Sequence, residues 1–242
     1  MDLGETLVHL DRPWSDVLET NVQSLHDYLS KLGLQFDYDQ FAERFIKILD
    51  DASAKADLYK IEIPMQEILT KVMKKSGLQF LGVDLPTAAM VEFYRPEVES
   101  WQLFPDTVDT LTKLKDGGFV LGVVSNSKSD WLVRSIIQRC DLDRFFQVVV
   151  SSAAVRIRKP RSEIFIEALK NLNVKASESA FVGDSISADV SGANSMGMHS
   201  IHVLRKPITD THPSHPDATV TKLAEIPEII DTWNNGSKPS TP

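Results

Sequence analysis

Six side chains in this chain of 242 residues could together perform chemistry on a phosphorylated compound: Asp2, Ser125, Asn126, Lys159, Asp184 and Asp189. A carboxylate such as Asp2 can attack phosphorus and form an aspartyl-phosphate, which water then cleaves. Because carboxylate and phosphate repel each other, the reaction needs cations. Asp184 and Asp189 offer hard oxygen ligands suited to Mg²⁺, and Lys159 would bring a compact positive charge to the phosphoryl oxygens. The Ser125 hydroxyl and neighbouring backbone N–H groups would hold a transferring oxygen.

The second half of the chain alternates between buried strands and helices. Apolar runs typical of strands covered on both faces occur at 119–124, 145–150, 180–182 and 201–204, with helical patterns between them. This alternation predicts a parallel, doubly wound α/β sheet, whose ligands bind beyond the carboxyl ends of the strands. Taken alone, Asp184 could cap a helix and Lys159 could be a solvated loop charge. Their placement after successive strands instead predicts one shared site.

Residues 14–95 differ from the second half, and we predict that they are all-helical. Apolar side chains recur at helical spacing, as at Leu18, Val22 and Leu25, and three further amphipathic stretches follow, the last at 86–94. Four helices with short polar breaks predict a small helical bundle. Four aromatic residues lie in this block or at its hinges, where most such side chains pack: Trp14, Phe93, Tyr94 and Trp101.

The order of these motifs resembles the haloacid dehalogenase (HAD) superfamily. Its members carry an aspartate nucleophile in a DxDxT motif, then a serine or threonine, then a lysine, then a GDxxxxD motif. The corresponding segments here are Asp2–Thr6, Ser125, Lys159 and Gly183–Asp189. The resemblance implies a Rossmann-like core formed by residues 1–13 and 96–233, and an inserted all-helical cap of the first type at 14–95. Residues 234–242 have turn formers and no apolar periodicity, so we expect a disordered tail.

The resemblance also implies an activity and a set of site residues. It points to a hydrolase, namely a Mg²⁺-dependent phosphatase of a small phosphorylated metabolite. The catalytic residues would be Asp2, Ser125 and Lys159, and the substrate would be bound by Ser125, Asn126 and Lys159. The metal ligands would be Asp2, Gly4 through its backbone carbonyl, Asp184 and Asp189.

Two departures from the family pattern bear on activity. The phosphatases of the family usually carry a second aspartate two residues after the nucleophile, which protonates the leaving oxygen, and here that position is Gly4. Loss of a placed general acid and base costs about 10²–10⁴ in rate, and most for alkoxide leaving groups. The family's first strand precedes the nucleophile, and Met1 alone cannot form it. We therefore expect the natural start to lie upstream, and a form without that strand to be poorly stable.

Two alternatives to a phosphatase stay open at this point. Relatives that act on phosphonates or carbon–halogen bonds also lack the second aspartate, so Gly4 is compatible with phosphonatase-like or dehalogenase-like chemistry. A catalytically degenerate binding protein of the same fold is the other alternative. The acidic pair near residue 184 favours the phosphatase, because dehalogenation needs no metal.

Composition excludes several classes of protein. Acidic residues number 34 against 26 Lys plus Arg, a net charge of −8, which argues against a nucleic-acid surface. Cys140 is the single cysteine, so no intrachain disulfide can form, and a cytoplasmic location is expected. No apolar run approaches the roughly 20 residues of a membrane helix. His212 and His215 lie beside prolines and are predicted to form a surface loop. The oligomeric state is left open.

Overall fold

Five parallel strands form the core of the computed structural model, which describes residues 1–78, 84–205 and 212–235. β3 (Leu121–Ser125) pairs with β4 (Phe146–Ser151). β5 (Ala180–Gly183) pairs with β6 (His199–Val203), which pairs in turn with β7 (Ala218–Val220). All three pairings are parallel, which confirms the predicted α/β fold. β7 was not predicted, because three residues carry too little apolar pattern.

The first two residues join the two groups of strands. The Met1 amino group donates to the Gly122 carbonyl oxygen at 2.7 Å, and the Val124 N–H donates to the Met1 carbonyl oxygen at 2.9 Å. On the other side, the Asp2 N–H donates to the Val182 carbonyl oxygen at 2.8 Å. A cavity of about 460 Å³ adjoins Met1 and is lined by residues of β3, β5 and neighbouring helices. The expectation that the natural start lies upstream stays a prediction.

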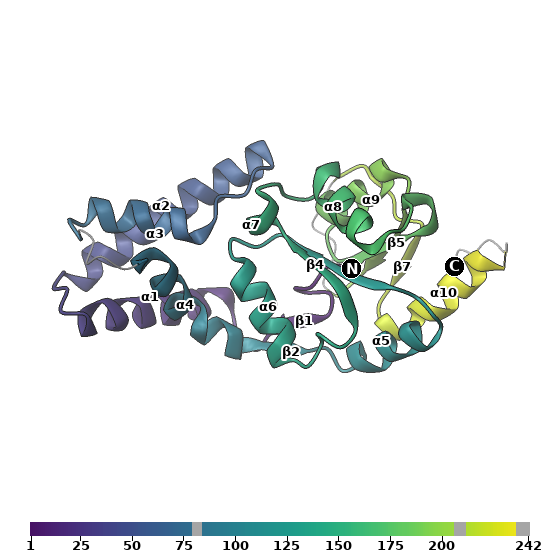
Figure 1. The fold of residues 1–242 in the computed structure, drawn as a ribbon, viewed down its shortest axis with the longest axis horizontal. Helices are drawn as coiled ribbons and strands as arrows, with labels where there is room; N and C mark the ends of the chain where they lie inside the picture. The colour runs from purple at the N-terminus through teal and green to yellow at the C-terminus, as the bar shows by residue number, and fades with distance from the viewer. Residues whose placement is uncertain (79–83, 206–211, 236–242) are drawn as a thin grey trace.

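Helices flank these strands on both sides (Figure 1). In that view α8 (Ser162–Leu172) and α9 (Ser191–Met196) lie above the strands, whereas α5 (Thr107–Asp116) and α10 (Ile226–Asn234) lie below. The connections after β3 and β4 contain α6 (Asp130–Arg139) and α7 (Ser152–Val155). Short 3₁₀ turns at Ala176–Glu178 and Leu223–Glu225 complete this part. A π-helical turn, η2 (Ile186–Val190), follows β5 and contains Asp189, the last residue of the acidic motif.

Four helices lie at the opposite end of the molecule from α10 (Figure 1). They are α1 (Trp14–Lys31), α2 (Tyr38–Tyr59), α3 (Met65–Lys75) and α4 (Leu85–Ser100). Their apolar faces bury large side chains such as Phe41, Phe45 and Phe93. The prediction that residues 14–95 are all-helical agrees with these elements. The division of the chain at 13/14 and 95/96 stays a prediction, and residues 236–242 of the predicted tail lie outside the described residues.

α4 continues past the predicted end at Tyr94 and contains Pro96. A proline inside a helix has no N–H to donate to the carbonyl oxygen four residues earlier. That oxygen belongs to Glu92, and the Ser24 hydroxyl of α1 donates to it at 2.9 Å. The neighbouring helix thus replaces the missing hydrogen bond, so the helix persists where its own sequence predicts an end.

Two junctions connect the helical region to the strands. β1 (Val8–Leu10) and β2 (Trp101–Leu103) form an antiparallel ribbon where the chain passes into and out of the helical region. At the second junction Ile61 bridges Ile157, and the Met65 N–H donates to the Lys128 carbonyl oxygen at 2.9 Å.

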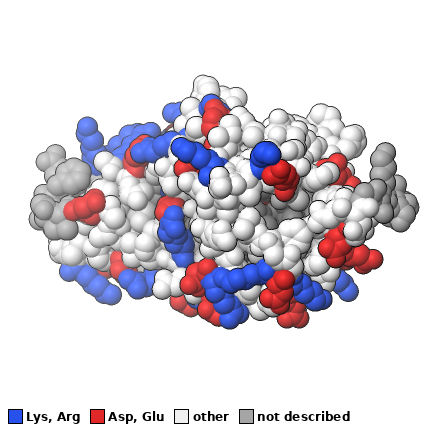
Figure 2. Space-filling view, turned by 45° about the vertical axis from the view of Figure 1, so that its right-hand side comes forward, with Lys and Arg blue, Asp and Glu red and all other residues white. Residues whose placement is uncertain are grey.

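The surface mixes both signs of charge. On the face shown in Figure 2, basic and acidic side chains are interspersed over a largely uncharged surface. Within the described ranges, no helix is both long enough and apolar enough to cross a membrane.

Candidate active site

Asp2, Lys159 and Asp189 meet in a buried cluster between the two groups of strands. The Lys159 ammonium group lies 2.5 Å from Asp2 Oδ1 and 2.7 Å from Asp189 Oδ1, and it donates to the Val124 carbonyl oxygen at 2.8 Å. Lys159 thus donates hydrogen bonds to Asp2 and Val124 and forms an ion pair with Asp189. Burial alone would lower the pKa of Lys159, but Asp189 and Asp2 outweigh it and hold that pKa above its ordinary value. Lys159 is therefore a fixed positive charge.

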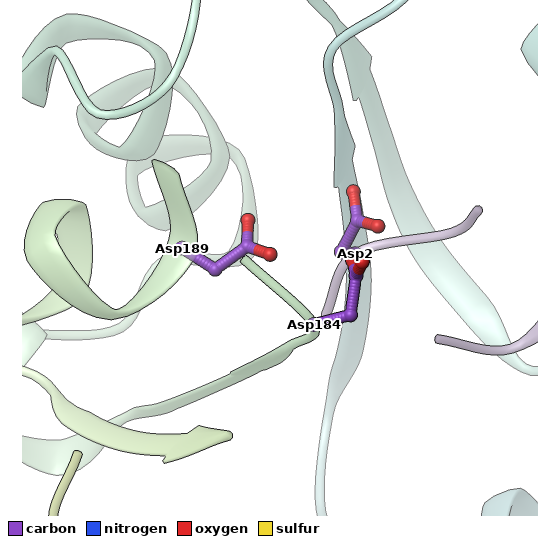
Figure 3. A group of neighbouring side chains, drawn as sticks. All are labelled: Asp2, Asp184 and Asp189. Carbon is purple, nitrogen blue, oxygen red and sulfur yellow. The ribbon is translucent and has the colours of Figure 1, made fainter. Parts of the chain in front are cut away.

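Asp184 completes a cluster of three carboxylates. One oxygen from each of Asp2, Asp184 and Asp189 lies within 4.8 Å of the others. Figure 3 shows Asp2 and Asp184 together, with Asp189 pointing toward them from the neighbouring turn. Burial, and then the charges of Asp2 and Asp189, raises the pKa of Asp184 to about 7. Burial also raises the pKa of Asp2, which Lys159 offsets only in part. The cluster holds more negative charge than one lysine can neutralise.

Local backbone geometry places Asp189 in this cluster. The Ser185 N–H donates to Asp189 Oδ2 at 3.0 Å, and the Ser185 hydroxyl accepts from the Ala188 N–H at 3.1 Å at the start of η2. Gly183, the last residue of β5, leaves the space that Asp189 occupies: a Cβ there would lie 2.2 Å from Asp189 Oδ2. The position of Asp189 therefore requires a glycine at residue 183 of the GDxxxxD motif.

Ser125 and Asn126 both line the cavity above this cluster, but they make different contacts. Ser125 ends β3 and is buried, with its backbone in register with Ser151 of β4. The Asn126 side chain forms two hydrogen bonds with the backbone of Lys159. Its Oδ1 accepts from the Lys159 N–H at 2.8 Å, and its Nδ2 donates to the Lys159 carbonyl oxygen at 3.2 Å. Asn126 therefore positions the lysine. The substrate contacts of both residues stay predictions.

Gly4 lies in the same cavity, beside an aromatic ring that the sequence alone did not place there. A Cβ on Gly4 would lie 3.2 Å from a carbon of the Trp101 indole. Trp101 therefore lies against position 4, where the DxDxT motif has its second aspartate. The role of the Gly4 carbonyl as a metal ligand stays a prediction.

The cavity has a volume of about 640 Å³ and lies between the helical region and the strands. The aromatic residues Trp14, Phe93, Tyr94 and Trp101 all line it. So does Glu97 of α4, which is only 3% exposed. Nothing in the sequence singles out Glu97, because an isolated glutamate on an amphipathic helix is usually solvated.

Three observations show that this donor set fits Mg²⁺. The ligand atoms are carboxylate oxygens, which this hard cation prefers. With all three carboxylates ionised and Lys159 protonated, the cluster carries two surplus negative charges, which one divalent ion would balance. Burial, and then the charges of Asp2 and Asp189, raise the pKa of Asp184 to about 7, and a divalent ion would offset this repulsion between carboxylates. Asp2, Asp184 and Asp189 are the residues that would hold the ion.

Comparisons with known proteins bear on the family. Residues 38–203 match the family model of the haloacid dehalogenase-like hydrolases. A glyceraldehyde 3-phosphate phosphatase of Methanopyrus kandleri is 29% identical, over 76% of this chain and 86% of that protein.

Two solved structures share the fold. A 2-haloacid dehalogenase from Pseudomonas syringae pv. Tomato superposes with a TM-score of 0.70 and is 24% identical, with 96% of each chain covered. The magnesium-bound HAD-hydrolase YfnB from Bacillus subtilis superposes with a TM-score of 0.62 and is 18% identical, with 95% of this chain and 96% of that chain covered.

Proposed function

The chain belongs to the haloacid dehalogenase-like hydrolases, and on that premise we propose that it is a Mg²⁺-dependent phosphatase of a small phosphorylated metabolite. The observation that carries the proposal is the position of Lys159, whose ammonium group lies 2.5 Å from Asp2 and 2.7 Å from Asp189. A nucleophilic carboxylate beside a fixed cation and two further acidic oxygens suits attack on an anionic phosphoryl group. The similarity to a glyceraldehyde 3-phosphate phosphatase supports a phosphorylated sugar metabolite as the substrate class.

In the proposed reaction Asp2 attacks phosphorus, and the bond between phosphorus and the leaving oxygen breaks. Lys159 neutralises charge on the phosphoryl oxygens, while Asn126 holds the backbone of that lysine in place. The Ser125 hydroxyl donates to a phosphoryl oxygen. Water then cleaves the aspartyl-phosphate and restores Asp2. A bound Mg²⁺ ion would supply further positive charge against the negative charges of nucleophile and phosphate.

The leaving oxygen receives no proton from a carboxylate at position 4, because that residue is Gly4 and Trp101 stands against it. Good leaving groups, such as the carboxylate of an acyl phosphate or the phenolate of an aryl phosphate, depart without a proton. We therefore propose that alkyl phosphates react more slowly than aryl or acyl phosphates.

The similarity to a 2-haloacid dehalogenase keeps dehalogenation as a second candidate. Gly4 is compatible with it, but the three clustered carboxylates are not needed for it. Chloride release from 2-chloropropionate in the presence of EDTA would favour dehalogenation.

The test compares hydrolysis of p-nitrophenyl phosphate, with Mg²⁺ or with EDTA, by the wild-type protein and by Asp2→Asn. We expect hydrolysis only with Mg²⁺, and a loss of at least about 1,000-fold in Asp2→Asn, the scale for removal of a nucleophile. Asp11→Asn, an exposed aspartate close in sequence, is the matched control and should keep full activity. A folded Asp2→Asn protein with wild-type activity would rule out the mechanism.

A further inference from the structure

The residues of α4 that line the cavity indicate what kind of organic group is esterified to the phosphate. We propose that Glu97 accepts a hydrogen bond from a hydroxyl group on the organic part of the substrate, so that the protein selects phosphate esters of uncharged, hydroxyl-bearing compounds over esters that carry a carboxylate. This inference rests on the proposed phosphatase function and deepens it.

Trp101 fixes where Glu97 stands relative to the reacting centre. A carbon of its indole lies 3.2 Å from the position of a Cβ on Gly4, and its Nε1 lies 3.4 Å from Glu97 Oε1. The indole thus lies between the carboxyl group and the turn that follows Asp2. The length of this ring separates the Glu97 carboxyl group from the position expected for the phosphoryl group. That part of the cavity is where the organic portion of a small ester bound at Asp2 would lie.

The hydrogen bonds of Glu97 leave room for a further donor. Asn21 Nδ2 donates to Glu97 Oε2 at 2.8 Å, and the Trp101 N–H donates to Oε1 over the long distance of 3.4 Å. An ionised carboxylate offers about four acceptor sites. Among the described residues Glu97 forms no ion pair, and Asn21 Oδ1 has no donor. Of the two residues only Glu97 lines the cavity, so its remaining acceptor sites are the ones that a substrate hydroxyl can fill and a substrate carboxylate cannot.

Apart from Lys159, the basic residues of the cavity lie at the second junction between the helical region and the strands. Lys128 and Arg158 pair with the buried carboxylate of Glu62, at 3.4 Å and 2.6 Å. The Arg158 N–H donates to the Lys60 carbonyl oxygen at 3.1 Å, so Lys60 adjoins the same junction. The residues that line the cavity from α4 and β2 are aromatic or acidic. A substrate carboxylate directed toward Glu97 would be repelled, because no basic side chain in the part of the chain that the structure describes neutralises the Glu97 carboxylate.

The first test measures kcat/KM for three substrates with wild type, Glu97→Gln and Glu99→Gln. Glycerol phosphate and 3-phosphoglycerate differ in a hydroxymethyl group against a carboxylate, and p-nitrophenyl phosphate has neither. We expect wild type to prefer glycerol phosphate over 3-phosphoglycerate by at least about 10-fold, the discrimination that a few placed polar contacts provide. In Glu97→Gln this ratio should fall at least about tenfold, through KM. Hydrolysis of p-nitrophenyl phosphate should stay within about threefold.

Glu99→Gln is the matched control, because Glu99 is exposed on the same helix and pairs with Arg139. It should keep the wild-type ratio. An equal loss on all three substrates in Glu97→Gln, or an unchanged ratio, would overturn the role of Glu97. Absence of p-nitrophenyl phosphate hydrolysis by wild type would instead overturn the phosphatase function itself, and this inference with it.

A second measurement needs no variant. Burial raises the pKa of Glu97 to about 7. The groups packed against Glu97 are Tyr94 on its own helix, Asn21 from α1 and Trp101 from β2; of these only Tyr94 titrates, with a pKa well above its usual value. The ratio between the two substrates cancels pH effects common to both. We expect preference for glycerol phosphate to increase between pH 6 and pH 8 in wild type and to stay constant in Glu97→Gln; a constant wild-type ratio would contradict the proposal.

Discussion

Replacing Gly183 by alanine changes the geometry of the acidic cluster without changing which charged residues it contains. Every carboxylate and Lys159 stay in the sequence, but the added Cβ would lie 2.2 Å from Asp189 Oδ2 and 2.4 Å from its Cγ. The Asp189 Cβ would itself lie 2.6 Å from the added methyl group, so rotation of the side chain cannot relieve the overlap and residue 189 must move away from position 183. It then loses the hydrogen bond from the Ser185 N–H at 3.0 Å and the ion pair with Lys159 at 2.7 Å.

Two magnitudes follow from this displacement. Forcing an extra methyl group into a packed site costs about 1–3 kcal/mol of unfolding free energy. For a chain of this size that corresponds to a fall of roughly 2–12 °C in melting temperature. Moving one of three oxygen ligands should weaken Mg²⁺ binding at least about tenfold, since even loss of a residue that orients a ligand costs 10–100-fold in affinity.

The assay pairs a thermal melt with a calorimetric Mg²⁺ titration of Gly183→Ala, wild type and Gly197→Ala. Gly197 has a φ of 71°, and no heavy atom outside its own chain neighbourhood lies within 4 Å of the position that a Cβ would take. Its substitution should therefore cost about 1 kcal/mol through backbone strain. This control should have a lower melting temperature than wild type but the same Mg²⁺ affinity. Wild-type Mg²⁺ affinity in a folded Gly183→Ala protein would refute the assignment of Asp189 as a ligand.

Three further predictions concern pH and position 4. Protons compete with the ion for Asp184, whose pKa burial raises to about 7, so Mg²⁺ affinity measured by calorimetry should fall about fivefold from pH 7 to pH 6, as the ionised fraction of Asp184 falls. Gly4→Asp should raise kcat for alkyl phosphates relative to p-nitrophenyl phosphate, by about 10²-fold where the new carboxyl protonates the leaving oxygen, and should lower the melting temperature because Trp101 must move; an unchanged ratio would contradict this. Burial raises the pKa of Glu97 from 4.5 to about 7. Its stabilising contribution is therefore present below pH 4.5 and lost as the pH rises through 7, so chemical denaturation should show wild type losing up to about 3 kcal/mol relative to Glu97→Gln across that range.

The convergence of Lys159 and Asp184 could be predicted from the sequence because it follows from topology, whereas Asp2 follows no apolar run and was placed by the resemblance to the family motif. Parallel strands have their carboxyl ends at one edge, so residues that follow successive apolar runs meet there whatever their distance along the chain. Asp2 and Lys159 are 157 residues apart and are joined at 2.5 Å. The predicted strands and the observed ones differ mainly at their ends, where apolar pattern is weakest.

Other features depend on contacts that no local pattern encodes. α4 runs through Pro96 because Ser24 of another helix donates to the Glu92 carbonyl oxygen. The ribbon of β1 and β2 has three residues in each strand, too few for a recognisable alternation. Trp101 was visible as an aromatic residue near a hinge, but its contact with Gly4 requires both passages of the chain through that hinge to be in place. Composition alone does not place two such segments side by side.

Gly4 and Trp101 are best understood as one feature of the site. A Cβ at position 4 would lie 3.2 Å from a carbon of the indole, so an aspartate there requires Trp101 to shift by a few tenths of an ångström. On the proposed mechanism Gly4 supplies no proton to the leaving group, and the indole of Trp101, which lines the cavity beside it, donates its N–H to Glu97. The same ring therefore connects a loss at the reacting centre to recognition of the organic part. On this argument Gly4→Asp, by moving Trp101, should also weaken the preference for glycerol phosphate over 3-phosphoglycerate, whereas a substitution that acted on proton transfer alone would leave that preference unchanged.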